Sequence, residues 1–132
     1  MSGLDMLMFV SDYDHNASVP GLRETHFRLY EKIREKHPTI PYIMVSKADT
    51  APHNFYGYND MVNRRLIIHD SYRRAWERGD RNVYLIDGDS VYHGEYADCA
   101  TVDGTHPNDL GFAFMAESYE KVIAEIIVNG KM

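Results

Sequence analysis

A carboxylate and a histidine stand three residues apart in the run Asp103-Gly-Thr-His106-Pro-Asn-Asp. A hydroxyl is a poor nucleophile at neutral pH, so it needs a base such as histidine, and the base needs a carboxylate that holds its ring in one tautomer. Gly104 gives the backbone the freedom to bring the two side chains together. Pro107 keeps His106 extended, and Asn108 can cap a helix that starts there. The spacing therefore predicts a base with its orienting carboxylate, although it also suits an ordinary helix start with a solvated histidine.

The nucleophile that such a base would activate is harder to find. Gly88-Asp89-Ser90 follows a predicted strand and spells a candidate nucleophile block. A three-letter match is weak evidence, so Ser90 is interpreted as a structural loop residue, with attack by Ser90 as the alternative. Weaker candidates near predicted strand ends are Ser11, Ser18 and Ser46.

Histidines can also indicate a metal site, and the five that could suggest one are His15, His53, His69, His93 and His106. None of them pairs at the spacing of a zinc site with enough further ligands. The sequence therefore predicts no metal ion, and these histidines are interpreted as solvated or capping residues.

Three alternations of an apolar run with a helical pattern must position these groups. The predicted strands are 4–10, 40–46 and 83–86, and the first is apolar enough to be buried on both faces. Helical spacing follows each strand: between Pro20 and Pro38, from a cap at Asn59 or Asp60 to Gly79, and over 108–128. Strand–helix units in series predict a parallel sheet whose ligand crevice lies at the carboxyl ends of its strands. The loops 11–18, 47–58 and 87–107 should meet there.

The first predicted strand raises a difficulty, because it has the character of an interior strand yet stands at the start of the sequence. A long apolar strand with a free edge is prone to pair with other chains. Three strands are also few for a sheet of this type. We therefore expect the sheet to be completed by an upstream segment, by a second chain, or by the equivalent strand in a homo-oligomer.

Length and composition restrict the class of protein further. The chain has 132 residues, enough for a single domain over 1–132, and 44% of them are hydrophobic. A net charge of −6 argues against a nucleic-acid surface. No apolar run approaches the ~20 residues of a membrane span, and no signal peptide is visible, which leaves the compartment undetermined. Cys99 is a single cysteine, and the pair Arg64-Arg65 is predicted on the solvated face of a helix.

Two blocks resemble a known family, the SGNH hydrolases or GDSL-type lipases and acylhydrolases. The blocks are Asp12-Tyr-Asp-His-Asn-Ala17 after the first strand and Val102-Asp-Gly-Thr-His-Pro-Asn-Asp-Leu-Gly-Phe112. The resemblance covers essentially the whole chain but only the C-terminal part of the family's domain. It implies a three-layer α/β/α, flavodoxin-like fold in βαβαβα order, incomplete here, and hydrolysis of carboxylic esters without a cofactor.

The resemblance also implies roles for individual residues. His106 would be the general base, Asp103 its orienting partner, and Asn16 a side-chain donor to the oxyanion. Asp14 and Ala17 depart from the glycine and aspartate of that family block, and the block that supplies the nucleophilic serine does not precede the first strand. The expected function is an ester hydrolase whose nucleophile comes from outside this sequence, acting on small acyl esters, with acylated carbohydrates as one class. The alternative is an inactive α/β module that serves as an oligomeric or binding domain.

Overall fold

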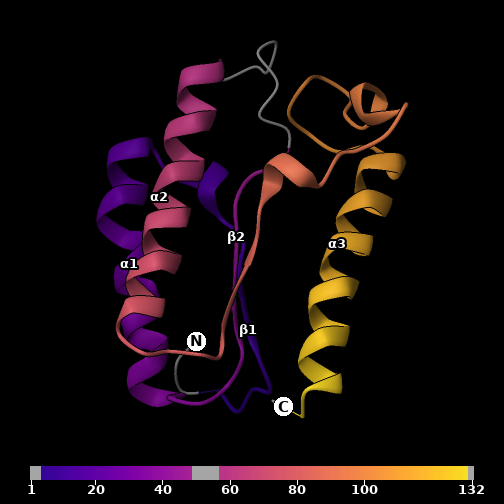
Figure 1. Ribbon diagram of the computed structural model, residues 1–132. Helices are drawn as coiled ribbons and strands as arrows, with labels where there is room; N and C mark the ends of the chain where they lie inside the picture. Colours follow the sequence, from indigo (N-terminus) through magenta and orange to yellow (C-terminus); the bar gives the residue numbers. More distant parts are fainter. Residues whose placement is uncertain (1–3, 49–56, 131–132) are drawn as a thin grey trace.

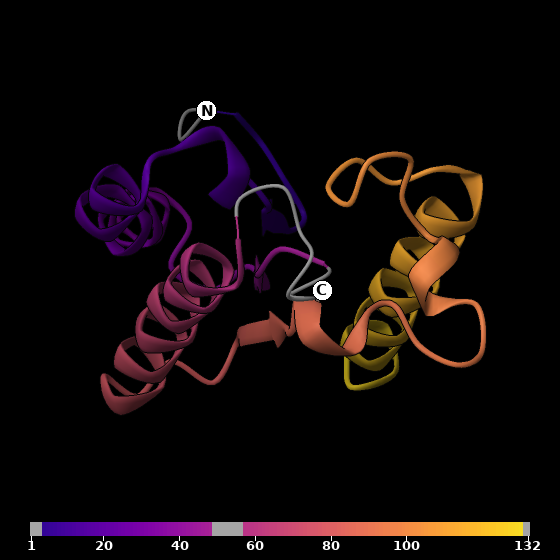
Figure 2. The same cartoon turned by 90° about the horizontal axis from the view of Figure 1, so that it is seen from above.

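The computed structural model describes residues 4–48 and 57–130 and contains one parallel sheet in the order β1-β2-β3. The strands are β1 (Phe9–Ser11), β2 (Tyr42–Val45) and β3 (Val83–Ile86), with Phe9 opposite Tyr42 and Met44 opposite Leu85. The helices α1 (Val19–Lys36) and α2 (Tyr58–Glu77) cover one face, and α3 (Asp109–Val128) covers the other (Figures 1 and 2). The predicted α/β class and its βαβαβα order are confirmed.

The central strand β2 divides the core into two parts, because successive side chains of a strand point to opposite faces. Tyr42 and Met44 pack with apolar residues of α1 and α2, whereas Ile43 and Val45 pack toward Ile126 of α3. All four residues of β2 are buried, so this strand is covered on both faces.

In the described part of the chain, none of the helices has the length and apolar character of a membrane span.

The first strand is shorter and more exposed than the sequence predicts. Only residues 9–11 pair with β2, while Leu4 and Leu7 keep 63% and 73% of their surface exposed. The apolar run could not reveal this, because burial depends on a neighbouring element, and no described element covers residues 4–7. Met8 and Phe9 are only half-buried and Val10 is 36% exposed, so the prediction of a strand buried on both faces over 4–10 is wrong.

The helix ends follow local signals in two helices and depart from them in the third. Ser18 caps α1, with its Oγ accepting from the N–H of Gly21 at 3.2 Å, and the helix ends before Pro38 as predicted. The predicted cap of α2 at Asn59 or Asp60 is wrong, because the helix already begins at Tyr58 after Gly57. The Asp60 carboxylate instead binds the side chain of Arg64.

Candidate functional site

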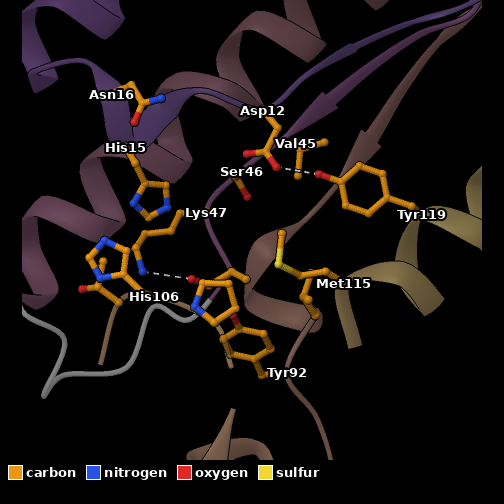
Figure 3. A pocket seen from close by; sticks show the side chains of 14 residues that line it. Asp12, His15, Asn16, Val45, Ser46, Lys47, Tyr92, His106, Met115 and Tyr119 are labelled. Carbon is orange, nitrogen blue, oxygen red and sulfur yellow. Dashed lines mark hydrogen bonds between the residues drawn. The ribbon is translucent and has the colours of Figure 1, made fainter. Parts of the chain in front are cut away.

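A cavity of about 260 Å³ opens at the carboxyl ends of β1 and β2 (Figure 3). The segments around it are the turn that follows β1, the residues that follow β2, the loop that carries His106, and the first half of α3. Its described lining residues are Asp12, His15, Asn16, Val45, Ser46, Lys47, Ala48, Val91, Tyr92, Thr105, His106, Pro107, Met115 and Tyr119. The crevice predicted at this edge of the sheet is therefore present, and the loop that carries the Asp-x-x-His run reaches it.

Asp103 and His106 are in direct contact. Asp103 Oδ2 lies 2.7 Å from His106 Nδ1, and Asp103 Oδ1 accepts from the backbone N–H groups of Thr105 at 3.0 Å and His106 at 2.8 Å. These bonds, the backbone bond from His106 first, lower the pKa of Asp103 to about 2, so this carboxyl is ionised at neutral pH. Gly104 makes the turn possible with a φ of 83°. A carboxylate on Nδ1 favours the tautomer with the proton there, which leaves Nε2 as the basic nitrogen.

The loop that holds this pair is fixed to the start of α3. Asn108 caps the helix, with its Oδ1 accepting from Gly111 N–H at 3.1 Å, while its Nδ2 donates to Cys99 O at 2.6 Å. The predicted helix start is thus confirmed. Gly111 is required because a Cβ there would lie 2.1 Å from Ala100 O. One asparagine and one glycine therefore hold the loop against the helix and set where His106 stands.

The turn after β1, Asp14–Asn16, brings two more polar side chains to the cavity. His15 is half-buried, and burial, followed by the charges of Lys47 and Arg64, lowers its pKa to about 4. Asn16 is exposed, and in the view of Figure 3 His15 stands between Asn16 and His106. Asp14 in the same turn is buried. Its Oδ2 accepts from Lys47 N–H at 2.8 Å, and its Oδ1 lies 3.4 Å from His15 Nε2.

The opposite wall of the cavity is more apolar. Tyr119 donates from its hydroxyl to Asp12 Oδ2 at 2.6 Å and so ties α3 to the end of β1 (Figure 3). Burial, followed by the bond to Asp12, raises the pKa of Tyr119. Val45, Val91 and Met115 complete this wall. The site thus has a polar side with two imidazoles and a more apolar side.

Sequence reasoning missed several residues of this site. Asp12 is the first residue after β1 and Lys47 the second after β2, so the rule that ligands bind at the carboxyl ends of parallel strands could have found them. Tyr119 lies in the interior of α3, where nothing in the sequence distinguishes it from a core residue. Arg64 was predicted on the solvated face of α2 and is instead 5% exposed, because the turn after β1 covers it.

Three of the four serines considered as nucleophiles, Ser18, Ser46 and Ser90, have hydrogen-bond partners in the structure. Ser90 Oγ donates to Asp87 O at 2.8 Å, and Ser90 does not line the cavity that His106 lines. Ser18 caps α1, and Ser46 lines the cavity but accepts from Gly88 N–H at 2.8 Å. Ser11 is buried. The hydrogen bond of Ser90 is that of a turn residue.

Among residues 4–48 and 57–130, no three His, Cys, Asp or Glu side chains converge on a position that could hold a metal ion. His53 lies outside the described residues, as do residues 49–56 of the loop predicted between the second strand and the second helix.

Comparison with known proteins gives a family match and similar solved structures, of which two follow. The model of the GDSL-like lipase/acylhydrolase family matches residues 1–124. A solved Bacteroides ovatus protein described as a GDSL-like lipase is similar over 96% of this chain and 37% of its own, with a TM-score of 0.81 and 27% identity. The salicylyl-acyltransferase SsfX3 from a tetracycline biosynthetic pathway shares the fold over 96% of this chain and 39% of its own, with a TM-score of 0.67 and 21% identity. The chain thus spans less than two fifths of either structure, and no curated protein matches its sequence.

Proposed function

The chain belongs to the GDSL-like lipase/acylhydrolase family, and from this premise we propose that its cavity is part of an active site for ester hydrolysis. Membership supports a function of the hydrolase or acyltransferase type. The observation that carries the finer proposal is the 2.7 Å contact between Asp103 Oδ2 and His106 Nδ1 at a cavity that Asn16 also lines. The contact provides a base and its orienting carboxylate next to a side-chain amide that can donate to an oxyanion.

In the proposed reaction a serine hydroxyl gives its proton to His106 Nε2 as its oxygen attacks the ester carbonyl. The carbonyl oxygen becomes an oxyanion, to which the Asn16 amide donates. The imidazolium, balanced by the Asp103 carboxylate, returns the proton to the departing alcohol oxygen and leaves an acyl-serine. Water then repeats the two steps with His106 as base, releasing the acid and the free serine.

We propose that the nucleophilic serine comes from polypeptide outside this sequence, on an element that adds to the outer edge of β1. Support comes from three candidate serines: Ser90 and Ser46 are both engaged in hydrogen bonds, and Ser11 is buried. An upstream segment and a second copy of the chain are the two candidate suppliers. The 132-residue chain alone is accordingly expected to be weak or inactive on esters.

The substrate class we propose is a small acyl ester, with acylated carbohydrates included. The apolar wall formed by Val45, Val91 and Met115 suits a short acyl group in a cavity of about 260 Å³. Asp12 and the tyrosines at 92 and 119 offer acceptor and ring surfaces to a polar alcohol.

The test uses p-nitrophenyl acetate and a fluorophosphonate that labels activated serines, applied to the chain alone and to its His106→Ala and Ser90→Ala variants. We expect no labelling and no turnover above free imidazole with the chain alone. Addition of a polypeptide carrying the nucleophile block should give labelling of that polypeptide, lost by about 10³-fold or more in His106→Ala. Labelling of Ser90 in the chain alone would overturn the external nucleophile. An assembled pair that never labels would favour the alternative, an inactive module that binds through the open edge of β1.

A further inference from the structure

Arg64 contacts the turn that carries His15 and Asn16 from behind. It projects from α2, its side chain is 6% exposed, and its Nη1 donates to the backbone oxygens of Asp14 and Ala17, the latter at 2.6 Å. These two carbonyl groups belong to the first residue of the turn Asp14–Asn16 and to the residue directly after it. One guanidinium group thus fixes both ends of a three-residue turn.

A second anchor ties the same turn to the sheet. The buried carboxylate of Asp14 accepts from the backbone N–H of Lys47, the second residue after β2. The turn is therefore held from α2 by its carbonyl groups and from the end of β2 by a side chain. With both anchors formed, His15 and Asn16 are among the residues that line the cavity.

We propose that Arg64 is a positioning residue of the site, which holds the turn Asp14–Asn16 so that His15 and Asn16 face the cavity. Its charge is balanced by Asp60, whose Oδ2 lies 2.5 Å from Arg64 Nε. This contact fixes the orientation of the guanidinium group, whose Nη1 then donates to the two carbonyl oxygens. A lysine has the same charge but places a single ammonium group on a flexible stem, and it cannot bind two carbonyl groups and a carboxylate in this planar arrangement.

The inference rests on the proposed function, because that function gives His15 and Asn16 their role, but its main test measures the conformation of the turn and not turnover. If the protein hydrolysed no ester, the positioning role of Arg64 could still be confirmed. If Arg64 did not hold the turn, the contact between Asp103 and His106 would still stand. The variant is Arg64→Lys, and the matched control is Arg65→Lys, the next residue on α2, which binds Asp87 at 2.7 and 2.5 Å.

The measurement is the NMR spectrum of the 132-residue chain, with backbone amide signals and imidazole signals of His15. In Arg64→Lys we expect the amide signals of 14–17 and the imidazole signals of His15 to shift, while signals of β2 and α1 remain. Arg65→Lys should leave these signals in place. In an assembly that hydrolyses esters, kcat should fall about 100-fold in Arg64→Lys with KM little changed, because a displaced oxyanion donor acts on the transition state.

Two results would overturn the proposal. One is an Arg64→Lys spectrum identical to that of the wild type over residues 14–17. The other is a folded Arg64→Lys variant whose signals shift as much in β2 and α1 as over residues 14–17, which would make Arg64 a residue of overall packing. Should Arg64→Lys fail to fold, Arg64→Ala with added methylguanidine provides a second measurement, in which restoration of the 14–17 signals supports the proposal and no restoration contradicts it.

Discussion

Two imidazoles share one cavity in this protein, and their surroundings give them different chemistry. His106 is exposed and contacts an ionised carboxylate, which suits a residue that takes up a proton. His15 is half-buried near Lys47 and Arg64, and its pKa of about 4 keeps it neutral at pH 7. His15 is thus a neutral hydrogen-bonding group at pH 7, whereas His106 is the residue that we propose as the base.

A third histidine, His26, should make stability depend on pH. It is 1% exposed, neither ring nitrogen has a hydrogen-bond partner among the described residues, and burial lowers its pKa from 6.5 to about 4. As the pH falls from 6.5 to 4, the unfolded chain takes up a proton that the folded chain refuses, so stability falls over this window. The shift corresponds to a loss of about 3 kcal/mol.

The variant His26→Leu should lack the part of the acid-induced loss of stability that His26 causes. Urea unfolding at about pH 8 should give a free energy within about 1 kcal/mol of the wild type, because the orphaned nitrogens also disappear. At about pH 4.5 the variant should be the more stable protein. A variant that loses as much stability between the two pH values as the wild type would contradict the prediction.

Asp14 should act on stability with the opposite sign. Burial, the largest cause, raises its pKa from 3.8 to about 6, so between these values the folded chain binds a proton that the unfolded chain has released. Its contribution to stability is therefore full below pH 3.8 and is lost as the pH rises through about 6. The amide oxygen of an asparagine can still accept from the N–H of Lys47, so Asp14→Asn should stabilise the protein by about 1 to 3 kcal/mol at about pH 8 and much less at about pH 4. The measurement is the difference in unfolding free energy between variant and wild type across this range, and a difference that shrinks as the pH rises would count against a buried charge.

At the scale of elements, the sequence predicted the features that local chemistry decides. Asn108 is a cap, Pro38 follows the end of α1, and the strand Val83–Ile86 has the predicted bounds. One failed prediction, the cap of α2 at Asn59 or Asp60, is local, and the others concern burial against distant parts of the chain. Arg64 contacts Asp14 in the turn after β1, which lies fifty residues earlier in the sequence. Residues 4–7 lack a covering element among the described residues. Periodicity in a sequence cannot report such partners.

Variants of Asn108 can separate the contributions of its two hydrogen bonds, one to the start of α3 and one to Cys99 O. Asn108→Ala removes the cap and the bond to Cys99 O, and it should cost about 1 to 2 kcal/mol of stability. Asn108→Asp keeps the acceptor for Gly111 N–H but loses the donor to Cys99 O. It should therefore approach wild-type stability while the imidazole signals of His106 still shift. Equal stability losses in both variants would mean that the bond to Cys99 O, and not the cap, stabilises the helix start.

At the scale of the whole molecule, the sheet is covered unevenly. The helices α1 and α2 pack on one face and α3 contacts β3 on the other, while β1 pairs only with β2 in the part of the chain that the structure describes. Val10 of β1 is 36% exposed, and Leu4 and Leu7 before it are more exposed still. An apolar strand with an unpaired edge is a template for a further strand. The same edge is where we propose that the nucleophile-bearing element adds.

The 132-residue chain by itself should therefore associate in solution through β1. Phe9 N–H donates to Pro41 O, and because consecutive residues of a strand turn their N–H groups to opposite sides, the N–H of Val10 points to the outer edge. Val10→Pro removes this donor without touching the ladder to β2, and Val10→Lys adds a charge that disfavours pairing.

Sedimentation equilibrium should give a mass above 15.3 kDa for the wild type and a mass closer to it for both variants. Val128→Lys is the control, since Val128 is 84% exposed at the far end of α3, and its mass should stay that of the wild type. A wild-type chain that remains at 15.3 kDa at all concentrations would show that this edge does not bind a second copy, leaving an upstream segment as the supplier of the missing strand.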